Sequence, residues 1–265
     1  MSAVAGVLRT SRVTLSTSSR HSSVQRGGLF VKALFYAMVF SIIASLWRAA
    51  AAANGGSVAG YSARQLMWYI AMSEAVTISM NSRLLADVGT DIVSGAVSVE
   101  MLRPRSVLAQ RVLREIGRVQ PGLLVCTLTG MAVSWIVVGP PISFSALALS
   151  FPSLVLAVTC NIAGHHLFAS LAFWLRETGA TWFIYQKFVF MLGGMLLPLE
   201  VLPSWLRQFA LLTPFPSMAY IPARLGSGHV EPWLLVVQLG WLAALLAAAA
   251  IGFRAGERRL QVVGG

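Results

Sequence analysis

The chain has 265 residues, of which 57% are hydrophobic and only 11% are charged. Because a soluble domain usually carries about 25% charged residues, this composition argues against a water-soluble enzyme. The formal net charge of +11 does not indicate nucleic-acid binding, since the basic residues flank apolar segments, where membrane insertion explains them. Cys126 and Cys160 lie inside apolar segments, so the sequence predicts no disulfide framework and no metal site.

The first 28 residues contain seven serines, four arginines and no acidic residue. This composition is typical of an organellar transit peptide, and it also fits a basic cytoplasmic segment ahead of a first membrane span. We favour the second interpretation. The chain then divides into a basic N-terminal segment (1–28), a six-span membrane domain (29–253) and a short cytoplasmic tail (254–265).

Six apolar segments are expected to cross the membrane, since a helix of about 20 residues spans the hydrocarbon layer. They cover residues 29–47, 65–81, 121–138, 144–173, 182–197 and 232–253. With the N-terminus inside, fifteen arginines and lysines lie on the cytoplasmic side, four lie outside, and Lys187 lies within the fifth span. The sequence therefore predicts an all-α integral membrane protein with both termini in the cytoplasm.

The inner loop at residues 87–118 is too long for a simple connector. Apolar residues recur in its first half at helical spacing, opposite Asp87, Asp91 and Ser98: they are Val88, Ile92, Val93, Ala96 and Val99. We expect one amphipathic helix there, ended near Pro104, which can open a second helix. The second helix carries an arginine stripe, and we expect it to lie at the membrane surface before the third span. The stripe comprises Arg111, Arg114 and Arg118.

Polar residues inside the spans are candidates for a translocation path. Glu74, Thr77 and Asn81 occur at i, i+3 and i+7 of the second span, so they share one helix face. A carboxylate at membrane depth faces a bundle interior or an aqueous path, so Glu74 is either a path residue or a hydrogen-bonded structural glutamate. His165 and His166 are adjacent and point about 100° apart, which makes a poor metal pair and favours hydrogen bonds between helices.

The outer segment at residues 198–231 is rich in proline, and its stretch at 205–212 is apolar enough to lie in the outer leaflet. Glu200 sits at the outer end of the fifth span, where exposure to water accounts for it. Lys187 lies about one and a half turns into that span, and we expect its ammonium group to extend toward the inner interface.

The chain contains no G-x-x-x-x-G-K-[ST] sequence, so it cannot hold ATP phosphates in a P-loop, and it lacks the H-E-x-x-H and G-x-S-x-G motifs. The pattern Asp91-Ile92, Gly95 and Leu102-Arg103-Pro104 instead resembles the first cytoplasmic loop of type-2 ATP-binding-cassette (ABC) exporter permeases, in their bacterial six-span branch. Segments 194–199 and 202–206 are similar to the outer re-entrant hairpin of that family, between spans five and six. The arginine at position 105 departs from the family pattern.

This resemblance implies an exporter half that pairs with a second permease, identical or paralogous, and with two separate ABC ATPase subunits. ATP and magnesium would bind to the ATPase subunits, and this chain would bind no cofactor and no nucleic acid. The chain would be a multi-pass protein among the lipids of the bacterial inner (cytoplasmic) membrane. The coupling helix gripped by the ATPase would comprise Asp87, Asp91, Ile92, Gly95, Glu100, Arg103 and Pro104. The residues expected along the translocation path are Glu74, Thr77, Asn81 and His165.

Two other classes of protein stay open. An intramembrane enzyme would need Glu74, His165 or His166 to converge in one pocket, whereas the sequence offers only separated polar residues. A channel or secondary transporter is expected to show inverted repeats, and the sequence contains none.

The distribution of basic residues predicts the orientation of the loops. Single cysteines placed at Gly55 and Gly228, in a chain whose Cys126 and Cys160 are replaced, should react with a membrane-impermeant thiol reagent in intact cells. Cysteines at Gly95 and Gly265 should react only after the cells are opened. Labelling at position 95 in intact cells would contradict the orientation.

Overall fold

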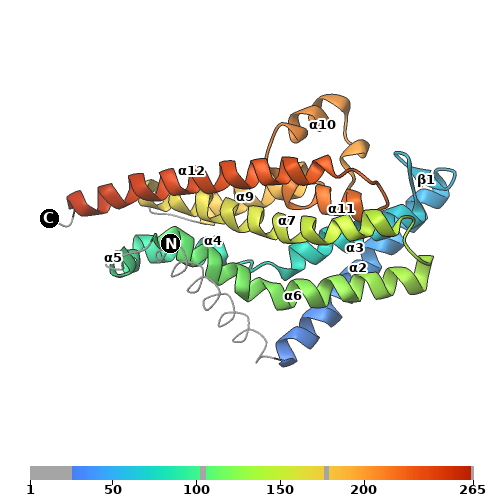
Figure 1. Cartoon of the computed structure of the whole chain (residues 1–265), viewed down its shortest axis with the longest axis horizontal. Coiled ribbons are helices and arrows are strands. Elements are labelled where there is room, and N and C mark those ends of the chain that lie inside the picture. The colour runs from blue at the N-terminus through green and yellow to red at the C-terminus, as the bar shows by residue number, and fades with distance from the viewer. Residues whose placement is uncertain (1–25, 102–105, 176–178, 264–265) are drawn as a thin grey trace, which may run out of the picture.

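The computed structural model describes residues 26–101, 106–175 and 179–263. Within these ranges the chain is mostly helical, and its long helices run roughly side by side (Figure 1). The helices are α2 (Arg26–Ala53), α3 (Ala63–Ser79), α4 (Leu84–Val93), α5 (Ala96–Met101), α6 (Val107–Val138), α7 (Phe144–Ser170), α8 (Ala172–Leu175), α9 (Gly179–Leu192), η1 (Leu199–Val201), α10 (Ser204–Leu211), η2 (Phe215–Met218), α11 (Tyr220–Gly226) and α12 (Trp233–Val263). A short hairpin of β1 (Ser57–Val58) and β2 (Tyr61–Ser62) precedes α3.

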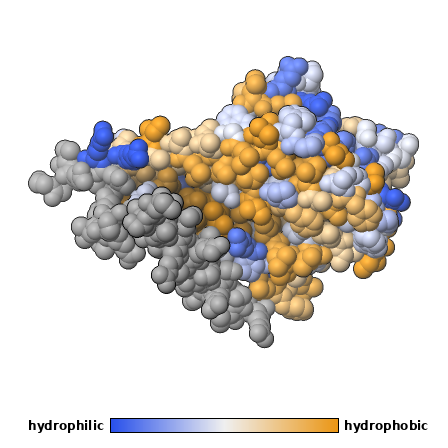
Figure 2. All heavy atoms as spheres, viewed as in Figure 1, coloured by the Kyte–Doolittle hydropathy of each residue, from blue (hydrophilic) through white to orange (hydrophobic). Residues whose placement is uncertain are grey.

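Four helices in the described part of the chain are long and apolar enough to cross a membrane. They are Gly28–Ala53, Val107–Val138, Phe144–Leu175 and Trp233–Gly256. The expected second and fifth spans coincide with α3 and α9, which have 17 and 14 residues. A helix of 14 residues is only about 21 Å long, so α9 is short for a complete crossing. Large apolar side chains cover much of the surface in Figure 2, as a bilayer environment requires.

Helix α3 is the centre of the bundle, because it packs against α2, α6 and α11. Twelve of its seventeen residues are buried. A capping box fixes its first turn: the Ser62 hydroxyl accepts a hydrogen bond from the Gln65 amide, and the Gln65 side chain accepts one from the Ser62 amide. The Tyr36 hydroxyl of α2 donates to the Ala71 carbonyl at 2.8 Å, which fixes α2 against the middle of α3.

The expected division of residues 105–138 into a surface helix and a separate third span is wrong. Helix α6 runs without interruption over 32 residues, capped by the Ser106 hydroxyl, and Pro121 lies inside it. A proline inside a helix removes one backbone hydrogen bond and costs about 3 kcal/mol in isolation. Packing of α6 along α3 and α2 stabilises the helix beyond this proline.

The amphipathic helix expected over residues 87–100 is also divided differently. Helix α4 ends at Val93 and α5 begins at Ala96, with a turn at Ser94 and Gly95. Gly95 has a φ of +76°, a left-handed conformation that glycine adopts without strain. A Cβ atom at Gly95 would meet no atom within 4 Å of the described chain, so within the chain the role of this glycine is to make the turn.

Two glycines give a matched test of the packing between α2, α3 and α6. A Cβ atom on Gly130 of α6 would lie 2.1 Å from the Tyr36 hydroxyl, whereas one on Gly240 of α12 would meet nothing within 4 Å. Gly130→Val should therefore destabilise the protein by about 1–3 kcal/mol, the usual cost of overpacking. Thermal unfolding in detergent should show a lower Tm for Gly130→Val and an unchanged Tm for Gly240→Val. Equal Tm values for both variants would contradict this packing.

Candidate functional site

A pocket of about 380 Å³ opens between the end of α3, the second half of α7 and most of the length of α9. We call it the inner pocket, since these parts of the three helices adjoin the loops expected in the cytoplasm. Its polar and aromatic lining comprises Thr77, Asn81, Ser82, Asn161, His165, Trp182, Tyr185, Gln186 and Lys187. The remaining lining is apolar, so the pocket suits a molecule that has both apolar and polar parts.

The polar lining of the inner pocket is held by hydrogen bonds between α7 and α9. The Tyr185 hydroxyl donates to the Asn161 side-chain oxygen at 2.9 Å, and His165 Nδ1 lies 2.8 Å from the Asn161 carbonyl. The His165 and Tyr185 rings meet edge to face at 4.6 Å. The hydrogen bond between helices that we expected for His165 is not what its Nδ1 makes, since this atom bonds within α7 and the contact of His165 with α9 is through the ring.

His166 points away from the inner pocket, as its position next to His165 predicts. Its Nδ1 lies 2.8 Å from the Ile162 carbonyl, and its ring packs 6.3 Å from that of Phe253 on α12. No group of three metal-ligating side chains occurs in the described ranges.

The structure brings together three of the four residues expected on the translocation path. Thr77, Asn81 and His165 line the inner pocket, but Glu74 does not. Glu74 is 3% exposed, and its Oε1 has no hydrogen-bond partner among the described residues. Helix α3 also ends at Ser79, so the i+7 relation between Glu74 and Asn81 is not preserved in the structure.

Lys187 lies on the lining of the inner pocket, with its Nζ 5.0 Å from the centre of the Phe183 ring. In the pocket as described, it is the only lysine or arginine side chain. A cation over an aromatic face is stabilised by the ring quadrupole, which leaves the ammonium hydrogens available to a bound group.

The inner loop is attached to α6 by one arginine. Arg111, only 8% exposed, lies 2.8 Å from Asp91 of α4 and 2.7 Å from Glu100 of α5. The apolar face of α4 is buried within the chain, so Ile92, which was expected in the gripped coupling helix, is not exposed to a partner; the buried residues are Leu84, Leu85, Val88, Gly89 and Ile92. The exposed side of α4 instead carries Asp87, Thr90 and Val93, while Arg103 and Pro104 lie outside the described residues.

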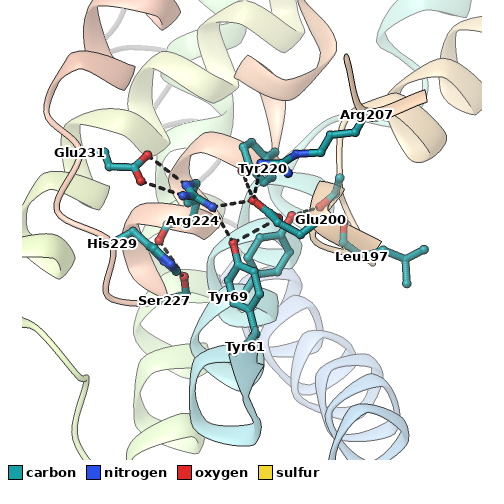
Figure 3. A network of polar contacts seen from close by, with 11 residues as sticks. Tyr61, Tyr69, Leu197, Glu200, Arg207, Tyr220, Arg224, Ser227, His229 and Glu231 are labelled. Atoms are coloured by element: carbon teal, nitrogen blue, oxygen red, sulfur yellow. Dashed lines mark hydrogen bonds and ion pairs between the residues drawn. The ribbon is translucent and has the colours of Figure 1, made fainter. Parts of the chain in front are cut away.

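The sequence analysis missed a polar cluster on the opposite, outer side of the bundle (Figure 3). Glu200 is not explained by exposure, because it accepts hydrogen bonds from Tyr220 at 2.6 Å, from Arg224 at 2.6 Å and from Tyr61 at 3.3 Å. Arg224 also makes a two-pronged ion pair with Glu231, at 2.7 and 3.0 Å. We call these five residues the outer cluster: Tyr61, Glu200, Tyr220, Arg224 and Glu231.

The outer cluster connects four separate parts of the chain. Tyr61 belongs to the hairpin before α3, Glu200 to η1 after α9, Tyr220 and Arg224 to α11, and Glu231 to the start of α12. Beside it, the Tyr69 hydroxyl of α3 donates to the Gly194 carbonyl, and the Trp47 indole of α2 donates to the Leu196 carbonyl at 3.1 Å. Local sequence patterns cannot reveal such a cluster, because its members are up to 170 residues apart.

A helical membrane bundle with an internal pocket, in a chain without a P-loop, has the features of a transport permease. A family model described as ABC-2 family transporter protein matches residues 33–264. The chain therefore belongs to the ABC-2 transporter family and is a multi-pass permease component of an ABC transporter, not its ATPase. The resemblance inferred from the inner-loop pattern is confirmed. No curated protein matches the chain.

The outer cluster provides a matched pair of arginines for a stability test. Arg224→Gln should remove the ion-pair partner of Glu231 and the closest positive charge beside Glu200, and should destabilise the protein by about 3 kcal/mol. Arg207→Gln removes a 3.5 Å, half-exposed contact with Glu200 and should change stability by less than about 1 kcal/mol. The measurement is Tm in detergent at pH 7, and equal effects of the two variants would contradict the cluster's role.

The same comparison should depend on pH. Hydrogen bonds from Arg224 lower the pKa of the Glu231 carboxyl, so the ionised carboxylate stabilises the fold above its unfolded-state pKa. This contribution is lost as the pH falls through the lowered pKa of the folded state. The Tm difference between wild type and Arg224→Gln should therefore shrink in acid.

Proposed function

We propose that the chain is one permease half of an ABC exporter, with six spans in which α3 and α9 are the second and fifth. In this proposal both termini are cytoplasmic, and the protein lies in the bacterial inner membrane. It pairs with a second permease, identical or paralogous, and with two ATPase subunits that hold ATP and magnesium. The chain divides into the segments 1–28, 29–253 and 254–265 described above.

The observation that carries the export direction is the contrast between the two sides of the bundle. The inner pocket is open beside the expected cytoplasmic loops. On the outer side, Tyr69 and Trp47 hold the backbone after α9, and the outer cluster holds α11 and the start of α12. A pocket that is accessible from inside and closed outside is the state in which an exporter takes up its cargo.

Transport then requires a second state, in which the outer contacts are open and the inner pocket is closed to the cytoplasm. ATP closes the two ATPase subunits, and their movement shifts the permeases toward a state in which the outer contacts open. ATP biases this equilibrium only as far as the ATP-bound subunits bind one state better than the other. Thr77, Asn81 and His165 contact the cargo in the inward-open state, and Lys187 provides the positive charge of the path.

The proposed contact with the ATPase is the exposed side of α4 together with α5. Helix α4 packs against α7, α8 and α9, and Arg111 connects both α4 and α5 to α6. A displacement of this loop is therefore transmitted directly to the helices around the inner pocket. Asp91 and Glu100 act within the chain, by binding Arg111, while Thr90 and Val93 are free to contact a partner.

The proposed pairing with a second permease uses apolar helix faces. Helices α2 and α9 expose several large side chains, namely Leu34, Met38, Ile42, Phe183, Ile184 and Phe190. Such a surface can be covered by lipid tails or by a second permease. Association of transmembrane helices is stabilised mainly by close packing of their side chains.

Substitutions on the exposed side of α4 test the coupling. Thr90→Arg and Val93→Arg should retain wild-type Tm, because neither side chain is buried, but should weaken binding of the ATPase subunits by tenfold or more. Ser57→Arg, at an exposed position of the hairpin that is expected on the outer side, is the matched control. Asp91→Arg is unsuitable here, because it places two arginines together inside the chain.

The measurement is recovery of ATPase subunits with the tagged permease, followed by ATP hydrolysis of the recovered complex. The isolated permease should hydrolyse no ATP. Normal recovery and hydrolysis for both α4 variants would disprove the coupling surface, whereas hydrolysis by the isolated chain would disprove the permease assignment.

A further inference from the structure

A second pocket, of about 330 Å³, lies between the beginning of α2 and α6. We call it the α2–α6 pocket. The connection at residues 80–82 lines both this pocket and the inner pocket. Its charged side chains are Lys32, Glu115 and Arg118. None of them lines the inner pocket, so this cavity is a separate candidate site.

Lys32 directs an incompletely paired ammonium group into this pocket. Its Nζ donates one hydrogen bond, to the Ser79 carbonyl at 3.1 Å. Among the described residues no carboxylate lies within ion-pair distance of Nζ, although an ammonium group carries three donors. A Cβ atom on Gly122 would lie 3.1 Å from Nζ, so the absence of a side chain at this position leaves room for the ammonium.

Arg118 contributes a second positive charge that is only partly used. One of its terminal nitrogens lies 3.2 Å from Glu115 Oε2, and the side chain is 50% exposed. A guanidinium has five N–H donors, so most of them remain available. With Glu115 ionised, the pocket carries two positive charges and one negative charge, which favours an anionic ligand.

The surroundings of the pocket are apolar, as expected for a site at a membrane boundary. Leu29 and Val119 line the pocket itself. On the adjacent outward face of α2, Phe30, Val31 and Leu34 are 62–70% exposed, and Figure 2 shows apolar surface over this helix. Basic groups below an apolar helix face match a ligand with an anionic head and hydrocarbon tails.

We propose that the α2–α6 pocket binds the phosphate headgroup of an anionic lipid from the inner leaflet. Lys32 and Arg118 contact the phosphate oxygens, and the acyl chains lie along the exposed face of α2. The bound lipid would connect α2 to α6 and to the end of α3. This site depends on insertion of α2 with its first turns on the cytoplasmic side, but not on the identity of any exported compound.

The test compares the full-length protein in nanodiscs of pure phosphatidylcholine and in nanodiscs that also contain phosphatidylglycerol. Phosphatidylglycerol should raise the Tm of the wild type, and native mass spectrometry should detect retained phosphatidylglycerol in preference to phosphatidylcholine. Lys32→Gln should weaken phosphatidylglycerol binding by about fivefold and reduce the Tm shift. Lys32→Arg, which keeps the charge, should restore both.

The matched control is Arg48→Gln, which removes an exposed positive charge near the opposite end of α2 and should leave phosphatidylglycerol binding unchanged. Equal loss in both variants would mean that the lipid responds to overall charge, and the site would be wrong. An equal Tm shift on adding inorganic phosphate to phosphatidylcholine nanodiscs would identify free phosphate as the ligand and overturn the lipid proposal. If Lys32→Gln does not fold, the test is whether the wild type retains phosphatidylglycerol in preference to phosphatidylcholine. Equal retention of the two lipids would disprove the site.

Discussion

The burial of α3 is the constraint on which the rest of this structure depends. In a membrane, association of helices gains little from the hydrophobic effect and relies on close packing and on hydrogen bonds between helices. Helix α3 meets this requirement in two ways. Gly130 of α6 leaves room for Tyr36 of α2 beside α3, and the hydroxyls of Tyr36 and Tyr69 donate to the backbone carbonyls of Ala71 and Gly194. Its first residues lie beside the outer cluster and its last residues line the inner pocket, so any movement of α3 affects both sides of the protein.

In the proposed exporter, the outer contacts also set the free-energy cost of opening the side of the bundle that carries the outer cluster. Glu200 and Arg224 are partly buried and multiply bonded, and separating such a pair without new partners is costly. Opening the outer side is therefore favourable only if water or cargo replaces these bonds, or if the ATPase stabilises the open state. Because tyrosine hydroxyls are neutral, Tyr61 and Tyr220 release Glu200 to water more easily than Arg224 does.

Much of the fold follows from the sequence because its signals are local. Apolar length and turn residues predict the beginning of α7 at Phe144 and the end of α6 at Val138 correctly. Two local signals were misleading: the third span was expected to begin at residue 121, but Pro121 lies inside α6, and one helix was expected in the first half of the inner loop, but Gly95 makes a turn there. The outer cluster could not be predicted, since Tyr61, Glu200 and Arg224 meet only after four segments have packed together. Conversely, Glu74 has the sequence signature of a path residue but is buried away from the inner pocket.

The continuity of α6 explains why the Arg111 contacts matter mechanically. Arg111 lies near the start of a helix that extends without a break to Val138, on the other side of the bundle. A hinge at Pro121 would let the inner loop move while the outer part of α6 stayed still. Under the proposed coupling, force applied to α4 and α5 would pass through Asp91, Glu100 and Arg111 to an unbroken α6, and would displace it against α3 and α2. The Tyr36 hydroxyl and Gly130 lie in that contact, so the packing that stabilises the bundle would also connect the α4–α5 loop to the other end of α6.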